Sequence, residues 1–193
     1  MIIDISQEIR NCKVYPGDPK PIVTKLSDIS KGDMYNLSSF SMCAHNGTHV
    51  DAPSHFIKNG KSIDMIPLER FVGECFVVRV SGYLLKEDAF SILNTAKENG
   101  TDQRILLKGD AIVTEEAAEI FALNNILLLG TESQSVGPME SPKRVHEILL
   151  SKNIVLLEGI NLGNVAEGVY FLCAQPLNIK GIEGSPCRAI LIK

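Results

Sequence analysis

Short apolar runs, bounded by polar and turn-forming residues, recur along the chain and predict a fold rich in β-strands. Several of these runs alternate or are β-branched, as strands tend to be. No internal repeat or charged linker interrupts them. The nine segments that we interpret as strands are residues 1–5, 22–26, 35–42, 75–80, 104–107, 125–129, 154–157, 169–174 and 188–192.

Three further segments have the apolar spacing of amphipathic helices. The first covers residues 86–99, and a glycine follows it as a stop. The second covers residues 115–121, with Thr114 as its cap and acids in the first turn, where they suit the helix dipole. Ser141 and Pro142 open the third, in the order favoured for a cap and a first-turn proline. Together, the predicted strands and helices indicate a mixed, strand-rich α/β fold.

Length and composition then narrow the class of protein. The 193 residues are expected to form one domain, 1–193, with a sizeable core. A net charge of −4, with 22% charged and 45% hydrophobic residues, is ordinary for a globular protein and argues against disorder. The lack of a basic excess argues against a nucleic-acid partner. The chain has only four histidines and no tryptophan.

The chain carries no sign of a membrane or secreted context. The first residues lack a basic segment followed by an apolar run, so no secretory signal is expected. No stretch approaches the roughly 18 apolar residues of a membrane span. The five cysteines, an odd number with wide spacing, fit reduced thiols in the cytoplasm better than a disulfide framework.

Three of the four histidines, His45, His49 and His55, fall within eleven residues, and Asp51 lies among them. Imidazole and carboxylate are usual ligands of Zn²⁺, Mn²⁺ and Fe²⁺. In an extended segment all four side chains would share one face, because all four positions have the same parity. Gly47 would permit an unusual backbone turn or a close approach to a bound ion. The alternative is a polar turn with surface histidines.

The fourth histidine and a later acid extend the candidate site. His146 lies beside the apolar stripe of the third predicted helix, where a half-buried core histidine is the common case. Glu158 ends the strongly apolar segment 154–157. A carboxylate there is costly to bury without a partner, which a metal ion would supply. An exposed acid at a strand end is the equal alternative.

Residues 45–55 read H-N-G-T-H-V-D-A-P-S-H and resemble the H-x-G-T-H-x-D-x-P-x-H signature of the cyclase family of metal-dependent hydrolases. This family includes the bacterial kynurenine formamidases and isatin hydrolases. The resemblance covers most of the chain: D-I-S at 4–6, Y-P-G-D-P at 15–19 and the tail at 175–189 are similar to further family segments. His146 and Glu158 stand at the spacing of the two later metal ligands.

The resemblance implies a specific site and fold. The implied metal ligands are His45, His49, Asp51, His146 and Glu158, with Asp51 and Glu158 bridging two ions and His55 as general acid/base. The implied cofactor is one or two divalent ions, Zn²⁺ first and Mn²⁺ as the alternative. The implied fold is the swivelling β/β/α domain, in a homo-oligomer that is commonly a dimer and otherwise a tetramer.

Two departures from the family pattern bear on the substrate. Tyr15 stands where the formamidases place a tryptophan in the substrate pocket. Glu132 stands where the family often has the shorter aspartate, and we expect it to reshape the rim of the pocket.

The resemblance implies hydrolysis of a small-molecule amide, first an aryl formamide, by metal-activated water. One alternative is hydrolysis of another cyclic amide, an imide or a lactone, as in the isatin hydrolases. Another is a metal-binding protein without catalysis, although structural zinc sites are closed and usually rich in cysteine.

Overall fold

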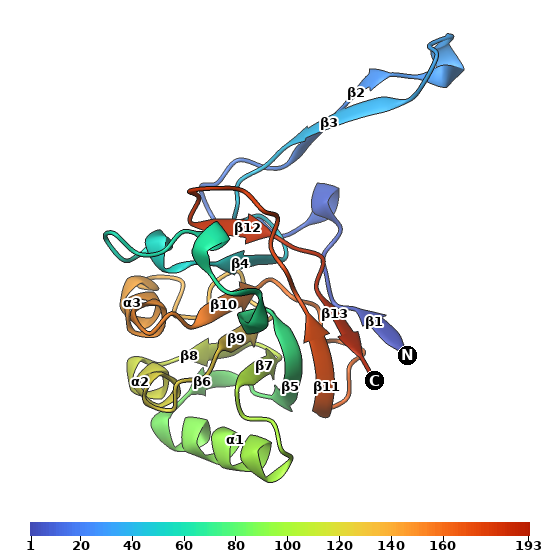
Figure 1. Ribbon diagram of the computed structural model, residues 1–193. Helices are drawn as coiled ribbons and strands as arrows, with labels where there is room; N and C mark the ends of the chain where they lie inside the picture. Colours follow the sequence, from blue (N-terminus) through green and yellow to red (C-terminus); the bar gives the residue numbers. More distant parts are fainter.

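A nine-stranded mixed sheet forms the body of the molecule in the computed structural model, which describes residues 1–193 (Figure 1). In spatial order its strands are β1 (Ile2–Asp4), β13 (Ile190–Ile192), β11 (Gly168–Cys173), β5 (Val72–Arg79), β7 (Arg104–Lys108), β9 (Leu128–Thr131), β10 (Val155–Glu158), β4 (His49–Asp51) and β12 (Gly184–Pro186). The central strands β5, β7, β9 and β10 are parallel, and the outer strands pair antiparallel. A short parallel ribbon joins β6 (Gly82–Leu84) to β8 (Ala111–Val113).

The three helices lie along one side of this sheet (Figure 1). They are α1 (Lys86–Glu98), α2 (Glu115–Leu123) and α3 (Lys143–Ser151). Thr114 caps α2 as predicted, because its Oγ1 accepts a hydrogen bond from the backbone N–H of Ala117 at 3.3 Å. The prediction that Ser141 caps α3 and that Pro142 lies in its first turn was wrong. Pro142 is the residue that flanks this helix, and no side chain caps it.

Both faces of the central strands are buried. Ile105 and Leu107 of β7 pack with the helices, whereas Leu106 between them packs in a second core on the opposite face. The same alternation divides β10, where Leu156 faces the helices and Leu157 does not. Strands that are covered on both faces have unbroken apolar sequences, which is why these runs are so plain in the chain.

All nine predicted strands are present, with ends that differ by a few residues, and the predicted α/β class is confirmed. The sequence did not indicate β6, β8 and β12, whereas β4 lies in the histidine segment, for which a strand or loop was expected; each of the four is three residues long. A strand of three residues is too short to carry an alternating pattern. None of the helices is both long and apolar enough to cross a membrane.

A two-stranded ribbon projects far from the body (Figure 1). It consists of β2 (Ile22–Ser27) and β3 (Leu37–Ser41), which pair antiparallel with each other and with no other strand. Every residue of β3 is exposed. We call residues 22–41 the β-arm.

Glu132 does not shape the pocket rim, contrary to the expectation from its extra methylene. Its carboxylate accepts backbone N–H bonds from Gly109 and from Leu162, both at 2.7 Å. Gly109 follows β7, and Leu162 follows β10, so the longer side chain ties two loops of the sheet together. Glu132 therefore stabilises the fold.

Replacing Glu132 with alanine is expected to lower the free energy of unfolding by about 2 kcal/mol, since each hydrogen bond to a charged acceptor contributes about 1.5–3 kcal/mol and this carboxylate is only partly buried. Urea denaturation of the variant measures the loss. Glu132→Gln retains one acceptor oxygen and should lose less. Equal stability of the alanine variant and the parent would contradict the assigned role.

Candidate metal centre

The pairing of β4 with β10 brings the first candidate ligands together. His49 lies directly opposite Glu158 across these antiparallel strands. Asp51 is two residues further along β4 and therefore on the same face as His49. Directly opposite residues in an antiparallel pair have neighbouring side chains. The register thus gathers one imidazole and two carboxylates from segments that are far apart in the sequence.

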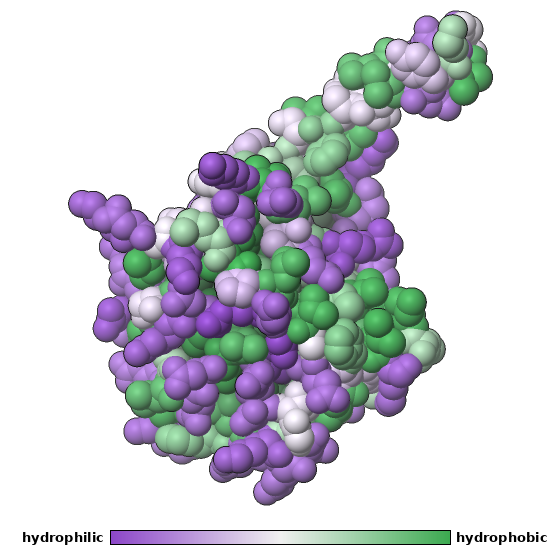
Figure 2. Space-filling view, in the orientation of Figure 1, coloured by the Kyte–Doolittle hydropathy of each residue, from purple (hydrophilic) through white to green (hydrophobic).

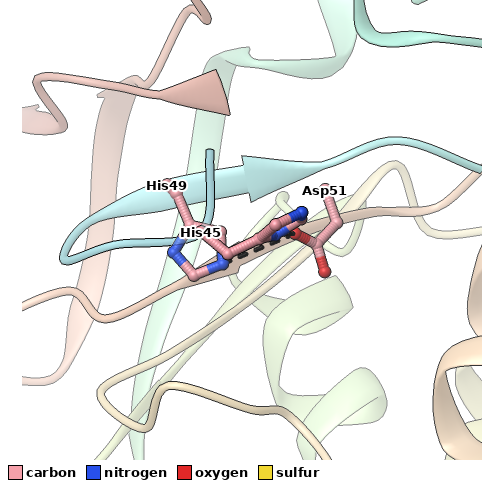
Figure 3. Close-up of side chains that lie close together, drawn as sticks. All are labelled: His45, His49 and Asp51. Carbon is pink, nitrogen blue, oxygen red and sulfur yellow. Dashed lines mark hydrogen bonds and ion pairs between the residues drawn. The ribbon is translucent and has the colours of Figure 1, made fainter. Parts of the chain in front are cut away.

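His45 reaches the same cluster from the turn before β4 (Figure 3). Its Nδ1 lies 2.8 Å from Oδ1 of Asp51. The Nε2 of His49 lies 3.4 Å from the same Oδ1 and 3.4 Å from Oε2 of Glu158. His49, Asp51 and Glu158 are all buried, so water is largely excluded from these contacts.

His146 completes the cluster from α3. Its Nε2 lies 3.3 Å from Oε1 of Glu158 and 3.8 Å from Oδ2 of Asp51. Two groups of side chains therefore have donor atoms that lie within 4.8 Å of one another. The groups are His45, His49 and Asp51, and Asp51, His146 and Glu158. Asp51 belongs to both, which is the arrangement that a bridging carboxylate needs.

Backbone carbonyls orient two of the imidazoles. Nδ1 of His49 lies 3.0 Å from the carbonyl oxygen of Gly47, and Nδ1 of His146 lies 2.8 Å from that of Pro142. Each Nδ1 therefore carries the proton, which leaves Nε2 of each ring as a metal donor. Gly47 has φ +65°, the unusual backbone turn that was predicted, and a Cβ there would come within 2.8 Å of Cys12, so this turn requires glycine.

A hydrogen bond ties the histidine loop to the strand of Glu158. The Oγ1 of Thr48 donates to the carbonyl oxygen of Gly159 at 2.7 Å, and Nε2 of Gln7 donates to the same oxygen at 2.7 Å. These bonds fix the threonine of the G-T-H segment next to the end of β10. The loop and the strand therefore hold their donors in one geometry before any ion binds.

The donor set fits a divalent cation. Nε2 of His45, Nε2 of His49 and Oδ2 of Asp51 are buried and have no hydrogen-bond partner. Asp51 and Glu158 have ion-pair partners among the histidines alone, with no lysine or arginine. Buried charges are normally paired or bound to metal. Imidazole and carboxylate donors without thiolates suit Zn²⁺ and Mn²⁺.

Charge coupling within the cluster shifts its pKa values. Burial works to lower the pKa of His45, but the hydrogen bond and charge of Asp51 raise it to about 9. In the same way Glu158 raises the pKa of His146 to about 8 against the effect of burial. Burial works to raise the pKa of Asp51, but the hydrogen bond and charge of His45 hold it below the usual value.

Metal affinity is expected to increase with pH up to about pH 9. Below about pH 8, both His45 and His146 carry a proton in the metal-free protein and must release it to bind a cation. Two released protons give up to about a 100-fold gain in affinity per pH unit below that point. Calorimetric titration with Zn²⁺ in buffers of different ionisation enthalpy counts these protons. An affinity that is flat between pH 6 and 8 would contradict the pairing.

His55 lies beside the cluster and outside both donor groups. It sits in a 3-10 turn (Pro53–His55) just after β4, and its ring stacks on that of His45 with centroids 4.0 Å apart. Burial lowers the pKa of His55 below its usual value, so the ring is neutral at pH 7. A neutral imidazole beside a metal site can accept a proton and return it.

A cavity of about 270 Å³ opens onto the cluster. All four histidines and Glu158 line it, together with Tyr15, Asp18, Phe56, Gln134, Ser135 and Pro142. The Oη of Tyr15 donates to the carbonyl oxygen of Met139 at 3.2 Å, which holds the ring at the pocket. The volume suits a small substrate.

These positions settle the alternatives that the sequence left open. Glu158 is buried, so the interpretation as an exposed strand-end acid was wrong. The histidine segment is not a polar surface turn, because His49 and Asp51 are 1% exposed. The segment is extended only over His49–Asp51, with a turn before it and the 3-10 turn after it.

Sequence reasoning gave no role to several residues of the site. Asp18 was visible only as part of the P-G-D segment, and Gln134 and Ser135 follow β9 with no distinguishing pattern. Glu183 also went unnoticed. Its Oε1 lies 3.4 Å from Nε2 of His45, and the adjacent Gly184 packs so closely on the His45 ring that a Cβ would come within 2.6 Å of it.

A His/carboxylate cluster that lines a cavity, with a spare neutral histidine beside it, defines a metal-dependent hydrolase. Comparison with known proteins identifies the family to which the chain belongs. The family described as "Putative cyclase" matches residues 3–138. Kynurenine formamidase of Salinibacter ruber is 35% identical over 98% of this chain and 96% of that protein, and the kynurenine formamidase of Erythrobacter litoralis is 31% identical over 98% and 93%.

Among solved structures, a potential metal-dependent hydrolase with cyclase activity superposes with a TM-score of 0.82 and 27% identity, over 99% of this chain and 96% of that one. The chain belongs to the cyclase family. The strand-rich α/β fold expected from the sequence is the fold of this family.

Proposed function

We propose that this protein hydrolyses the C–N bond of an aryl formamide with the help of divalent metal. The observation that carries the proposal is the pair of donor groups that share Asp51 next to a neutral histidine in a cavity. The likeness to two kynurenine formamidases over nearly the whole chain supports the formamide as substrate. Residues 1–193 act as one catalytic domain.

Five side chains would hold the metal: His45, His49, Asp51, His146 and Glu158. When bound, a divalent cation lowers the pKa of water from 15.7 to about 7 and polarises a carbonyl group. Asp51 and Glu158 would supply the negative charge that retains one or two cations. Zn²⁺ is the proposed ion, and Mn²⁺ suits the same donors.

His55 moves the protons of the reaction. Its neutral ring accepts a proton from the water that attacks the formyl carbon, and a C–O bond forms there. The same proton then passes to the amide nitrogen as the C–N bond breaks, which gives an arylamine and formic acid, and the acid releases its remaining acidic proton to solvent as formate. Such transfer is typically worth about 10²–10⁴ in rate.

The ring of Tyr15 would stack on the aryl group of the substrate. It lines the cavity and is held by the bond to Met139. A phenol ring in place of an indole leaves room for other aryl amides than N-formylkynurenine.

We further propose that the protein is a cytoplasmic homo-oligomer. The cytoplasmic location agrees with the five free cysteines.

Elemental analysis and a substrate panel test the proposal. Purified protein is expected to contain one or two equivalents of zinc or manganese, and to hydrolyse formanilide faster than an aliphatic formamide, an isatin-like lactam or a lactone. A chelator should abolish the activity, and added metal should restore it. Absence of stoichiometric metal, with hydrolysis untouched by chelator, would refute the proposal. Preference for the lactam would redirect it to cyclic amides.

A further inference from the structure

The cavity at the candidate metal centre differs in character from the exposed surface of the β-arm. Hydrophobic residues follow the arm along its length (Figure 2). Only two of the eleven residues that line the cavity are hydrophobic, and none is a lysine or an arginine. A ligand in this cavity therefore meets polar groups of the protein, but neither of the two side chains that usually pair with a carboxylate.

A tight turn carries two of the side chains that line the cavity. The backbone N–H of Asp18 donates to the carbonyl oxygen of Tyr15 at 3.0 Å, and Gly17 has φ +101°. Proline in the second position and a glycine of positive φ in the third are typical of a type II turn, whose end residues have Cα atoms within about 7 Å of each other. The Oη of Tyr15 donates to the carbonyl oxygen of Met139, which fastens the turn to the segment before α3. The ring of Tyr15 and the carboxylate of Asp18 are therefore held close together at the cavity.

The carboxylate of Asp18 is free to bind a ligand. It is half-buried, forms no ion pair and accepts no hydrogen bond from the rest of the chain. Asp18 also belongs to neither of the two donor groups of the metal centre. Its negative charge is therefore available to a cation that enters the cavity.

Two further side chains of the cavity have polar atoms without a hydrogen-bond partner. The Nε2 of Gln134 donates to the carbonyl oxygen of Gly47 at 3.2 Å, and this bond fixes the direction of the amide because a carbonyl oxygen can only accept. The Oε1 of Gln134 is then a buried acceptor with no donor. Ser135 is 3% exposed, and its Oγ is likewise buried without a partner. Buried acceptors are costly to leave unpaired, so the cavity favours a ligand that brings N–H donors.

We propose that the substrate is an aryl formamide whose ring carries an alkylammonium group and no carboxylate, and that Asp18 binds this ammonium. The inference rests on the proposed function and names the ring substituent, which that function leaves open. With the aryl ring stacked on Tyr15, a substituent of that ring comes next to the other end of the turn, where Asp18 lies. The formamide brings one N–H donor and the ammonium brings three.

A carboxylate on the same ring is disfavoured by the same groups. It would meet the charge of Asp18 and the acceptor Oε1 of Gln134, with no lysine or arginine in the cavity to pair with it. Removing an unpaired carboxylate from water has a large cost, and repulsion between like charges adds to it. The arrangement therefore selects a cationic substituent over an anionic one.

The test compares formanilides that carry a 2-aminoethyl, a 2-hydroxyethyl or a carboxymethyl group, each at the ortho, meta and para positions. At about pH 7.5 the aliphatic amine is protonated. At the best position, kcat/KM of the parent is expected to be at least about tenfold higher for the ammonium compound than for the hydroxyl compound, as a hydrogen bond to a charged group would give. The carboxylate compound should be the slowest.

Two variants assign the preference to its residue. In Asp18→Asn, kcat/KM for the ammonium and hydroxyl compounds should agree within about threefold, because the charge that separates them is gone. The matched control is Asp102→Asn, which changes a half-buried aspartate outside the cavity and should keep the ratio of the parent. An Asp18→Asn variant that keeps the preference for the ammonium would overturn the assignment to Asp18.

The substrate panel needs only the parent, so it decides the inference even if the variant does not fold. Equal kcat/KM for the three compounds, or a preference for the carboxylate, would overturn the inference and leave the hydrolase in place. If no formanilide is hydrolysed, the proposed function fails, and calorimetric binding of the three corresponding anilines to the parent decides the ammonium site separately. Tighter binding of the ammonium compound supports that site, and equal affinities overturn it.

Discussion

Alanine in place of His55 is expected to leave the metal content unchanged and to lower kcat for an aryl formamide by about 10²–10⁴. The metal stays because His55 belongs to neither donor group. The rate falls because the cavity then has no imidazole outside the two donor groups to carry the proton between water and the amide nitrogen. Elemental analysis and steady-state kinetics on the same preparation measure both quantities.

The pH profile separates a proton carrier from a merely structural ring. Burial lowers the pKa of His55 from its usual value, and the neutral form is the one that accepts a proton. In the parent, kcat should therefore fall as pH falls through that pKa, below about 6.5. The alanine variant should lack this acidic limb, and added imidazole should restore part of the rate. Retained metal with an unchanged rate would exclude the proton role.

Glutamine in place of Glu158 is expected to remove metal and activity together. Glu158 lies within 3.4 Å of both His49 and His146, and the neutral amide withdraws a charge that helps to hold the cation. Changes to groups that only support ligands already cost about 10–100-fold in metal affinity, so the loss at a ligand should be about 100-fold or more. Metal titration and kinetics measure the two losses.

The glutamine variant is chosen to spare the fold. Oε1 of Glu158 accepts the backbone N–H of Val136 at 2.8 Å, and a glutamine carbonyl can accept the same bond. Glu183→Gln is a matched control, since it neutralises a carboxylate near His45 that is outside both donor groups. A glutamine variant at Glu158 that keeps full metal and full rate would remove this residue from the ligand set.

The candidate site could be predicted in outline from the sequence because three of its possible metal ligands, His45, His49 and Asp51, lie close together in the chain. The common parity of His49 and Asp51 correctly placed them on one face, and Gly47 has the positive φ expected of it. The residues around Glu158 did not decide between a buried metal ligand and an exposed acid at a strand end. Its burial depends on β4, a three-residue strand that pairs with β10 from the other half of the chain. Contacts of this kind leave no local pattern in the sequence.

The β-arm shows the opposite limit. Residues 22–26 and 35–42 were correctly interpreted as strands, because the apolar and β-branched content of a strand is local. That the ribbon projects from the body could not be predicted from these residues, because it depends on β2 and β3 pairing with each other and with no strand of the main sheet. Likewise the role of Glu132 depends on two loops that are distant in the sequence, because the backbone N–H groups of Gly109 and Leu162 donate to its carboxylate.

The bond between Thr48 and Gly159 spans 111 residues of sequence, and its place beside the donors has a consequence for biosynthesis. A ribosome adds about 5–20 residues per second, so the histidine segment emerges roughly 5–20 s before the strand that ends in Glu158. During most of that interval the nascent chain offers only His45, His49 and Asp51 of the five proposed ligands, because His146 comes shortly before Glu158 in the chain. The complete proposed donor set exists only after Glu158 has been synthesised, so full loading of the proposed metal site would follow synthesis of most of the chain.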